Sequence, residues 1–325
     1  MLYYFIQRIL GAIPVVFAGI TITFFILHLA PGDPASLLLS PSSNAATEQI
    51  LTERYGLDQS LFSQYLKWLS NVIFHFDFGN SFRNGRPAGA IITEAFSSTI
   101  LLTLSSLIIG LIIGIAVGVF AALRNGTASD RLLNSLMLIF YSTPTFWIGL
   151  ILLIIFGIQL DWFPISQLTS VWHDHLSLPA KFFDYIAHLT LPVITLCLPI
   201  SATFYRYIRS GMIEALQSEY VLAAKARGIS HKKIIWNYAL RNAILPVISI
   251  LGLSIPMLFS GAVVIEVIFS LPGMGRTLVS ATLSRDYPVI LAAGVFSFIA
   301  VIVGNLFADI GYGLADPRIR IKGTN

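Results

Sequence analysis

Long apolar runs separated by short polar stretches dominate the chain. Windows that contain no Asp, Glu, Lys or Arg cover residues 9–30, 95–123, 132–160, 185–205, 242–265 and 287–308. Each window reaches or exceeds the roughly 20 residues that a helix needs to cross the hydrocarbon core of a bilayer. Only helices fit such windows, because backbone groups in lipid must be paired within the segment. The pattern predicts an all-α membrane protein with six transmembrane helices and with both termini on one side.

The composition excludes a soluble globular protein. The 325 residues are 56% hydrophobic and only 11% charged, whereas soluble domains have about 25% charged residues. The first window is too long and intact for a cleaved signal, and the segment LAPGDP (Leu29–Pro34) at its end lacks a good small-x-small cleavage site, so we expect a retained span. The single cysteine, Cys197, excludes an internal disulfide and a cysteine-cluster metal site.

The basic residues predict the orientation of the spans. Most of the 20 Lys and Arg residues lie on the side of the termini: Arg8, Arg124, Arg131, those between Arg206 and Arg241, Arg318, Arg320 and Lys322. The opposite side holds most of the 16 acidic residues. Positive charge concentrates in cytoplasmic loops, so we expect both termini in the cytoplasm.

The loop over residues 31–94 is long enough to form a small extracytoplasmic domain. It contains two amphipathic stretches, Glu48–Leu57 and Leu61–Phe76, followed by the turn-rich segment FDFGNSFRNGRP (Phe76–Pro87). Two interpretations stay open for this domain. It either caps the ends of the spans, or it forms a lip that guides substrate or docks a soluble partner.

The cytoplasmic loop over residues 206–241 contains a predicted helix–glycine–helix element. Glu219–Arg227 consists of strong helix formers, and Gly228 is the expected left-handed residue that ends such a helix. Ser230 can cap a second helix over His231–Tyr238. Two short helices joined by one glycine are therefore expected on the cytoplasmic side.

The first of these helices has an unusual surface for a membrane protein. Its alanines leave one face nearly without side chains, which permits a close fit into a groove: Ala223, Ala224 and Ala226. Positive charges surround that face: Lys225, Arg227, Lys232 and Lys233. The alternative is a basic helix lying on anionic headgroups. An interfacial helix, however, needs bulky apolar residues where this one has alanines, so the pattern favours docking to a soluble partner.

This loop resembles the EAA loop of ABC importer permeases. Ala223, Ala224 and Gly228 occupy matching positions, whereas Leu222 stands where the family has its namesake Glu. Tyr238 and Arg241 also replace the usual Ile and Pro. The form ALRNAILP (Ala239–Pro246) is similar to the variant of the dipeptide/oligopeptide/nickel permease family, in its first, B-type permease. Further segments resemble that family in the same order: Arg8 with PGDP, FGNSFRNGRP, STPTFWIG, VVIEVIFSLPGMGR, RDYPVI and DPRIR.

The resemblance implies a type I ABC importer permease fold and a division of the chain. It consists of an N-terminal segment with the first span (1–30), an extracytoplasmic domain (31–94), a permease core (95–313) that includes the coupling loop 206–241, and a cytoplasmic tail (314–325). The implied residues for coupling to an ATPase are Glu219, Ala223, Ala224, Lys225, Arg227 and Gly228. The implied location is the bacterial or archaeal inner membrane.

The resemblance also implies partners. They are a second homologous permease that completes the pathway, two cytoplasmic ATPase subunits and an extracytoplasmic substrate-binding protein. No GxxxxGK[ST] segment occurs in the chain, so ATP and Mg²⁺ are expected on the ATPases and no cofactor on this chain. The expected cargo is a di- or oligopeptide. Nickel or a nickel chelate is the alternative, and residues that bind the cargo are not predicted.

Several residues within or beside the spans indicate packing or contacts. Gly110, Gly114 and Gly118 repeat every four residues and favour close helix contact. Prolines that can kink the spans are Pro144, Pro192, Pro199 and Pro256. Glu266 and Asp309 lie at span ends, where a permease-partner or gating contact is the candidate role.

The histidines raise the question of a metal site. His173-Asp174-His175 lies in an outer loop, and two His with one Asp can ligate a transition metal. Neighbours at i and i+2 in a loop are more often solvated, so no metal site is predicted. His28 and His188 are expected to be interfacial or packing groups.

Two other classes of membrane protein have little support in the sequence. A secondary transporter needs coupling-ion groups or discontinuous helices at the membrane midplane, and the span centres here lack charges. An intramembrane enzyme needs an activated nucleophile or a metal cluster within the spans. With one Cys and no HExxH segment, the chain offers neither.

Overall fold

The structure is a computed structural model that describes residues 2–29, 59–260 and 262–315. Helices account for nearly all regular structure in this part of the chain, and the residues group into two compact units. The first unit joins the described residues up to Thr99 with Phe259–Val263 and Pro272–Leu306. The second unit contains Ile100–Leu258 and Val264–Leu271.

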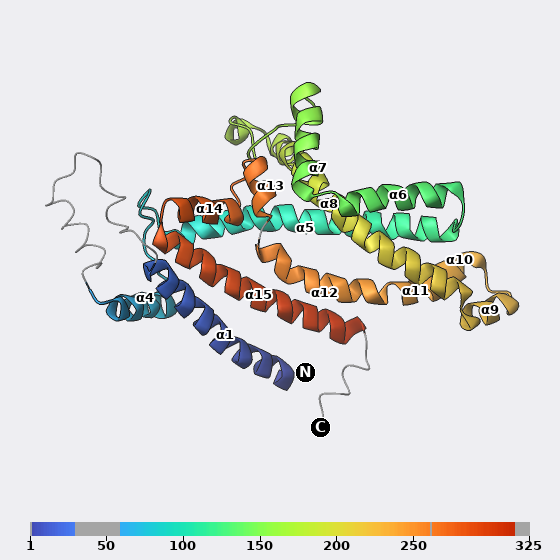
Figure 1. The fold of residues 1–325 in the computed structure, drawn as a ribbon, viewed down its shortest axis with the longest axis horizontal. Coiled ribbons are helices and arrows are strands. Elements are labelled where there is room, and N and C mark those ends of the chain that lie inside the picture. Colours follow the sequence, from blue (N-terminus) through green and yellow to red (C-terminus); the bar gives the residue numbers. More distant parts are fainter. Residues whose placement is uncertain (1, 30–58, 261, 316–325) are drawn as a thin grey trace. The chain divides into compact units, whose positions relative to one another are not determined.

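The first unit is built from helices at both ends of the chain (Figure 1). They are α1 (Leu2–Leu29), α4 (Leu61–His75), the first turns of α5 (Ala88–Leu123), α14 (Met274–Leu283) and most of α15 (Tyr287–Ala315). Helix α1 lies beside α15, where a Cβ built on Gly19 would come within 2.5 Å of the Phe298 ring. Ile92, Ala292 and Ala293 are fully buried in the core of this unit.

Helix α4 confirms the second amphipathic stretch predicted in the outer loop. The Ser60 hydroxyl accepts a hydrogen bond from the Ser63 N–H at 3.3 Å, which caps the start of the helix. Phe76 ends it in the left-handed conformation. The turn-rich segment after it closes with a single antiparallel bridge between Asn80 and Pro87. The first amphipathic stretch, Glu48–Leu57, lies outside the described residues.

The second unit is organised around α8, a helix of 40 residues. The elements of this unit are the rest of α5, α6 (Ala128–Ser142), α7 (Thr145–Leu152), the π-helix η1 (Leu153–Gln159), the 3-10 turn η2 (His173–His175), α8 (Leu178–Gln217), α9 (Glu219–Ala226), α10 (His231–Lys233), the π-helix η3 (Ile234–Ala239), α11 (Leu240–Ala243), α12 (Leu245–Ser260) and α13 (Val263–Ile268), with α12 and α13 reaching the unit boundary.

The glycine repeat of α5 makes the close helix contact that was predicted, and the structure identifies α8 as its partner. A Cβ built on Gly110 would come within 2.7 Å of Ile200 Cγ2. A Cβ built on Gly114 would come within 2.7 Å of Phe204 Cβ and of the Ser201 carbonyl oxygen. Only glycine lets the two backbones approach this closely, because any side chain would push the helices apart.

The candidate spans lie where the sequence windows predict them, but not all of them are single continuous helices. Four helices are long and apolar enough to cross a membrane: Leu10–Leu29, Ala88–Leu123, Leu178–Gln217 and Tyr287–Leu306. Two further spans exist only if each bent helix pair counts as one, so the described residues give four to six spans. The exact number of six stays a prediction.

The predicted third window is not one straight helix. Its two halves, Ala128–Ser142 and Thr145–Gln159, meet at 102°. The break falls at Thr143 and Pro144, because proline disfavours a helical conformation in the residue before it. The prolines of α8 behave differently, since Pro192 and Pro199 lie inside a helix that remains continuous.

Candidate functional site

The loop that follows α8 forms the helix–glycine–helix element expected from the sequence. Gly228 has φ +74°, the left-handed conformation, and its N–H donates to the Lys225 carbonyl at 2.9 Å. The Ile229 N–H donates to the Ala224 carbonyl at 3.2 Å. This pair of hydrogen bonds is a Schellman motif, which satisfies the last carbonyls of α9 and fixes the direction of the chain after it.

The inner face of α9 is buried against the rest of the loop. Val221 and Ala224 are fully buried, and both pack with Ile234 of η3. Ala224 was expected on the bare outer face of the helix, and this placement is corrected by its burial. The reason is the apolar stripe of Val221 and Ala224, three residues apart, which faces the following helix.

The outer face of α9 is exposed. Ala223 and Ala226 are exposed there, together with Leu222, Lys225 and Arg227. Glu219 is exposed in the first turn. Five of the six predicted coupling residues therefore lie at the surface, whereas Ala224 supports the surface from below.

The second half of the loop departs from the predicted single α-helix. Ser230 has extended N-cap geometry but makes no side-chain cap hydrogen bond. Only His231–Lys233 is α-helical before the chain widens into the π-helix η3. Ile234, Ile235 and Ala239 of this π-helix are buried.

Positive charge surrounds the outer face of α9, and the Asn242 side chain of α11 joins α9 to η3. Exposed basic side chains of the loop are Lys225, Arg227, His231, Lys232, Lys233 and Arg241. The Asn242 amide donates to the Tyr220 hydroxyl at 2.8 Å and to the Tyr238 carbonyl at 3.1 Å. The loop is thus a folded platform at the end of α8 that presents a small-residue face within a basic rim.

The two candidate contact residues at span ends keep their untested roles. Glu266 in α13 is fully buried in this chain, and its permease-partner or gating contact stays a prediction. The side chain of Asp309 lies outside the described part of the molecule. Its partner or gating contact stays a prediction.

His173 of the segment before α8 and His188 of α8 itself contact a carboxylate of α8. His173 Nδ1 lies 2.7 Å from Asp184 Oδ2, and His188 Nδ1 lies 3.3 Å from Asp184 Oδ1. The Ser170 N–H also donates to Asp184 Oδ2, at 3.0 Å. Within the described residues no group of three or more His, Cys, Asp or Glu side chains is arranged to hold a metal ion. The Asp184 carboxylate instead anchors the loop before α8.

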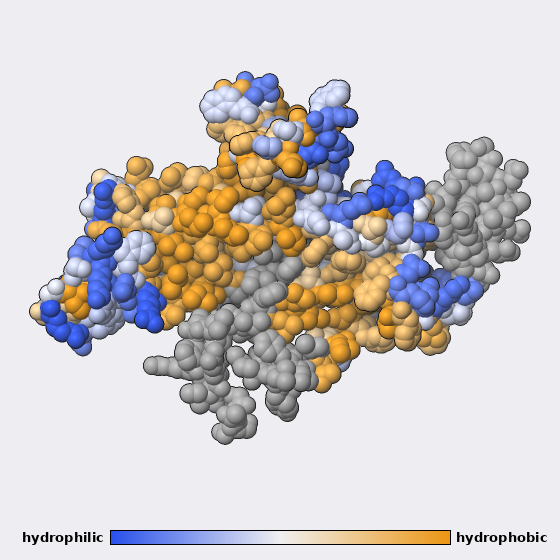
Figure 2. Space-filling model, turned by 180° about the vertical axis from the view of Figure 1, so that it is seen from behind, coloured by the Kyte–Doolittle hydropathy of each residue, from blue (hydrophilic) through white to orange (hydrophobic). Residues whose placement is uncertain are grey.

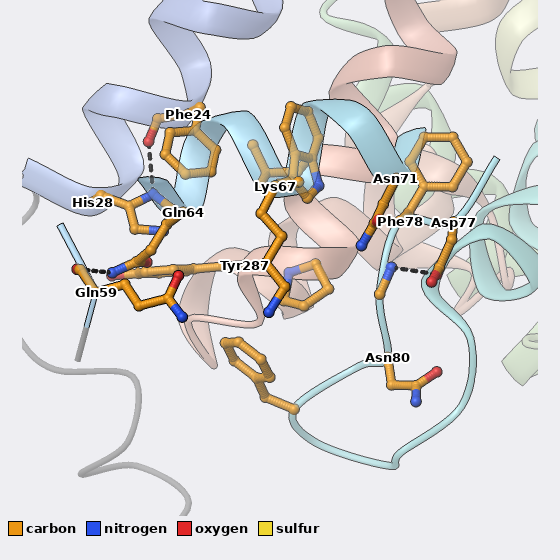
Figure 3. Close-up of a pocket in the computed structure, with 15 residues that line it drawn as sticks. Phe24, His28, Gln59, Gln64, Lys67, Asn71, Asp77, Phe78, Asn80 and Tyr287 are labelled. Carbon is orange, nitrogen blue, oxygen red and sulfur yellow. Dashed lines mark hydrogen bonds between the residues drawn. The ribbon is translucent and has the colours of Figure 1, made fainter. Parts of the chain in front are cut away.

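A polar cavity that sequence reasoning missed lies in the first unit (Figure 3). Its volume is about 260 Å³. Phe24 and His28 of α1, Gln64 and Lys67 of α4, and Tyr287 of α15 belong to its lining. The Lys67 side chain extends from α4 into the open space, and His28 is held by a 2.8 Å hydrogen bond to the Phe24 carbonyl. No spacing rule connects residues of three helices so far apart in the chain.

A buried carboxylate fixes the turn beside this cavity. The Ser81 hydroxyl donates to Asp286 Oδ2, and the Phe82 N–H donates to Asp286 Oδ1 at 3.0 Å. Arg83 Nη1 donates to the Ser280 hydroxyl at 3.0 Å. The motif segments FGNSFRNGRP and RDYPVI, about 200 residues apart, therefore meet through Asp286.

The helices are long and apolar enough to cross a membrane, and a folded basic loop follows α8; comparison with known proteins gives the family. The model of the binding-protein-dependent transport system inner membrane component matches residues 114–321, and the model of its N-terminal membrane component matches residues 1–103. The chain belongs to this family of ABC importer permeases. It is thus a multi-pass membrane protein of a kind that works with an ATPase and a substrate-binding protein.

Relatives match over nearly the whole chain. The oligopeptide transport system permease protein AppB of Bacillus subtilis is 40% identical over 320 residues, covering 98% of this chain and 99% of the relative. The glutathione transport system permease protein GsiC of Escherichia coli is 34% identical over 322 residues, covering 99% and 100%. A solved structure of the MetNI methionine ABC transporter, with TM-score 0.51 and 14% identity, covers 70% of this chain and 97% of its own and shares the type I importer permease fold.

Proposed function

We propose that the chain is the permease subunit of a binding-protein-dependent ABC importer for di- or oligopeptides. The single observation that supports its mechanical role is the Schellman-capped α9, whose outer face is bare at Ala223 and Ala226 and ringed with positive charge. A cleft in a cytoplasmic ATPase can receive such a face closely. Because α9 directly follows α8, movement of the ATPase is transmitted to a helix of 40 residues.

The proposed assembly has this chain and a second, homologous permease forming the pathway. Two ATPase subunits bind ATP and Mg²⁺ and engage the coupling loops, and a binding protein delivers substrate to the outer face. ATP binding draws the ATPases together, and alternating access follows from two conformations biased by nucleotide and by the loaded binding protein. Both termini and the loop 206–241 are placed in the cytoplasm, as the basic residues favour.

The proposed cargo is a peptide rather than nickel. The relative of highest identity given above is an oligopeptide permease, and the second is a permease for glutathione, itself a small peptide. The cavity of the first unit supports this choice, because its lining residues Gln64, Asn71 and Lys67 can hydrogen-bond the backbone and the terminal carboxylate of a peptide. We place this cavity, with the turn held by Asp286, on the extracytoplasmic lip formed by the domain over residues 31–94.

The test compares uptake of labelled peptides and of radioactive nickel in a strain that lacks this gene. Restored cells carry the intact gene, an Ala223→Trp variant or a matched Ala128→Trp variant, whose alanine is exposed on α6 outside the coupling loop. We expect loss of peptide uptake in the deletion, recovery with the intact gene and with Ala128→Trp, and little recovery with Ala223→Trp. Nickel uptake lost alone would contradict the peptide assignment. Normal peptide uptake by Ala223→Trp would contradict the coupling role of α9.

A further inference from the structure

A second polar cavity lies in the second unit, where α6 packs on α8. Its volume is about 320 Å³. Asn134 of α6 and five successive or near-successive residues of α8 line it: Tyr205, Arg206, Tyr207, Arg209 and Ser210. Two arginines and two tyrosines around one cavity give it donors for hydrogen bonds and positive charge, so its chemistry suits an anion.

One of the two arginines is already paired with a carboxylate. Arg209 forms a two-pronged pair with Asp130, with Nε at 2.7 Å from Oδ1 and Nη2 at 2.8 Å from Oδ2. Arg209 Nη2 also donates to Asn125 Oδ1 at 3.2 Å, and the Gly126 N–H donates to Asp130 Oδ2 at 3.0 Å. This network fixes the α5–α6 turn against α8 and makes a rigid wall for the cavity.

The other arginine has no carboxylate partner within the described residues. Arg206 is exposed, its guanidinium lies 4.5 Å from the centre of the Tyr141 ring, and it forms no salt bridge within the part of the chain that the structure describes. The neighbouring Tyr205 is 1% exposed, and its hydroxyl has no hydrogen-bond partner among those same residues. Buried hydroxyls normally have a partner, so the wall of this cavity contains an unused polar group beside an uncompensated cation.

We propose that this cavity binds the phosphate group of an anionic lipid headgroup. A guanidinium presents two parallel N–H donors, and two oxygens of a phosphate can accept both hydrogen bonds at once. The phosphate group of a lipid has no donor of its own that would compete. Exposed apolar surface lies close to the cavity: Tyr207, which lines it, is 44% exposed, and Leu138, one helical turn after the lining residue Asn134 of α6, is 58% exposed. Such surface suits acyl chains and favours a lipid over free phosphate as the source.

The location of the cavity agrees with the distribution of lipids and suggests a consequence. Figure 2 shows polar residues gathered at the end of the second unit that contains α9 and α10, with hydrophobic surface along its helices. In the orientation proposed above this end is cytoplasmic, and anionic lipids concentrate in the cytoplasmic leaflet. About two helical turns of α8 separate Ser210 from Gln217, after which α9 begins. A bound lipid would therefore brace α6 and α8 directly before the coupling platform.

The experiment titrates the whole detergent-solubilised transport complex with short-chain phosphatidylglycerol and measures the rise in melting temperature. Short-chain phosphatidylcholine and inorganic phosphate are the comparison ligands. We expect Arg206→Gln to raise the phosphatidylglycerol concentration for a half-maximal shift about fivefold. Arg206→Lys keeps the charge but not the paired donors, so its half-maximal phosphatidylglycerol concentration is expected to lie between those of the unmodified protein and Arg206→Gln. Tyr205→Phe tests the unpartnered hydroxyl without altering the charge.

Arg124→Gln is the matched control. Arg124 is also exposed, and its guanidinium lies 4.1 Å from the centre of the Phe120 ring, but it does not line the cavity. Its variant should respond to phosphatidylglycerol as the original protein does. An equal response to phosphatidylcholine, or equal losses in Arg206→Gln and Arg124→Gln, would overturn the proposal. An equal response to inorganic phosphate would keep the phosphate site and reject a lipid as its source.

Discussion

Replacement of Gly228 tests whether the geometry of the coupling platform matters for transport. Gly228 has φ +74°, and a Cβ built there meets no atom within 4 Å. The cost of Gly228→Ala is therefore the left-handed backbone alone, about 1–2 kcal/mol. That cost lowers the ratio of capped to uncapped α9 by a factor of about 5–30. Asn tolerates the left-handed conformation, so Gly228→Asn should retain most of the capped form.

The assay measures peptide uptake per ATP hydrolysed in proteoliposomes that contain the whole complex. We expect peptide uptake per ATP hydrolysed to decrease from the unmodified protein to Gly228→Asn, then Gly228→Ala and finally Gly228→Pro. Proline comes last because it also removes the N–H that donates to the Lys225 carbonyl. The matched control is Gly126→Ala, since Gly126 has φ +81° and open space around its Cβ position but lies in the α5–α6 turn. Equal ratios for Gly228→Asn and Gly228→Ala, or the same decrease in Gly126→Ala, would refute the reasoning.

Two further predictions concern packing and the outer turn. Asp286→Ala removes the acceptor of the Ser81 hydroxyl and the Phe82 N–H, which destabilises the turn by about 2–5 kcal/mol; faster amide hydrogen exchange over residues 79–87 checks this, and unchanged exchange would contradict it. Gly114→Ala places a Cβ 2.7 Å from atoms of α8 and should destabilise the permease by about 1–3 kcal/mol. A lower melting temperature for this variant, with no change for Gly11→Ala, whose Cβ position is open, is the expected result.

Local signals in the sequence were sufficient for α9, the first helix of the loop, and for the glycine that ends it. A run of helix formers followed by Gly228 predicts a helix that ends in a left-handed residue, and the structure has both. Local signals did not separate Ala223 from Ala224. The face that turns inward is decided by Ile234 and Tyr238, which contact α9 only after the chain has reversed direction.

Windows of hydrophobicity located the spans but not their breaks. The window 132–160 contains no charge and gives no sign of a break, whereas Pro144 was one of four prolines expected to be able to kink a span. The structure bends it by 102° beside Pro144, whereas Pro192 and Pro199 leave α8 continuous. Proline removes one donor in each case, so the outcome depends on the surrounding packing, which a single sequence does not reveal.

The cavities were beyond sequence reasoning for a related reason. The cavity of the first unit combines residues of α1, α4 and α15. The cavity of the second unit depends on the Arg209–Asp130 pair, whose members are 79 residues apart. Asp286 was visible only as part of a family-like segment, and no periodicity connects it with Ser81. Contacts between distant segments follow from the fold, while local patterns report only neighbours along one helix or turn.

The most direct test of the central claim is cysteine crosslinking between α9 and the ATPase. In a Cys197→Ser background, Ala223→Cys and Ala224→Cys place a thiol at adjacent positions, one exposed and one buried. With a short thiol-to-amine crosslinker and the whole complex, the account predicts a product with the ATPase subunit from Ala223→Cys and little or none from Ala224→Cys. Equal yields at the two positions, or no product at Ala223→Cys in a complex that still transports, would contradict it.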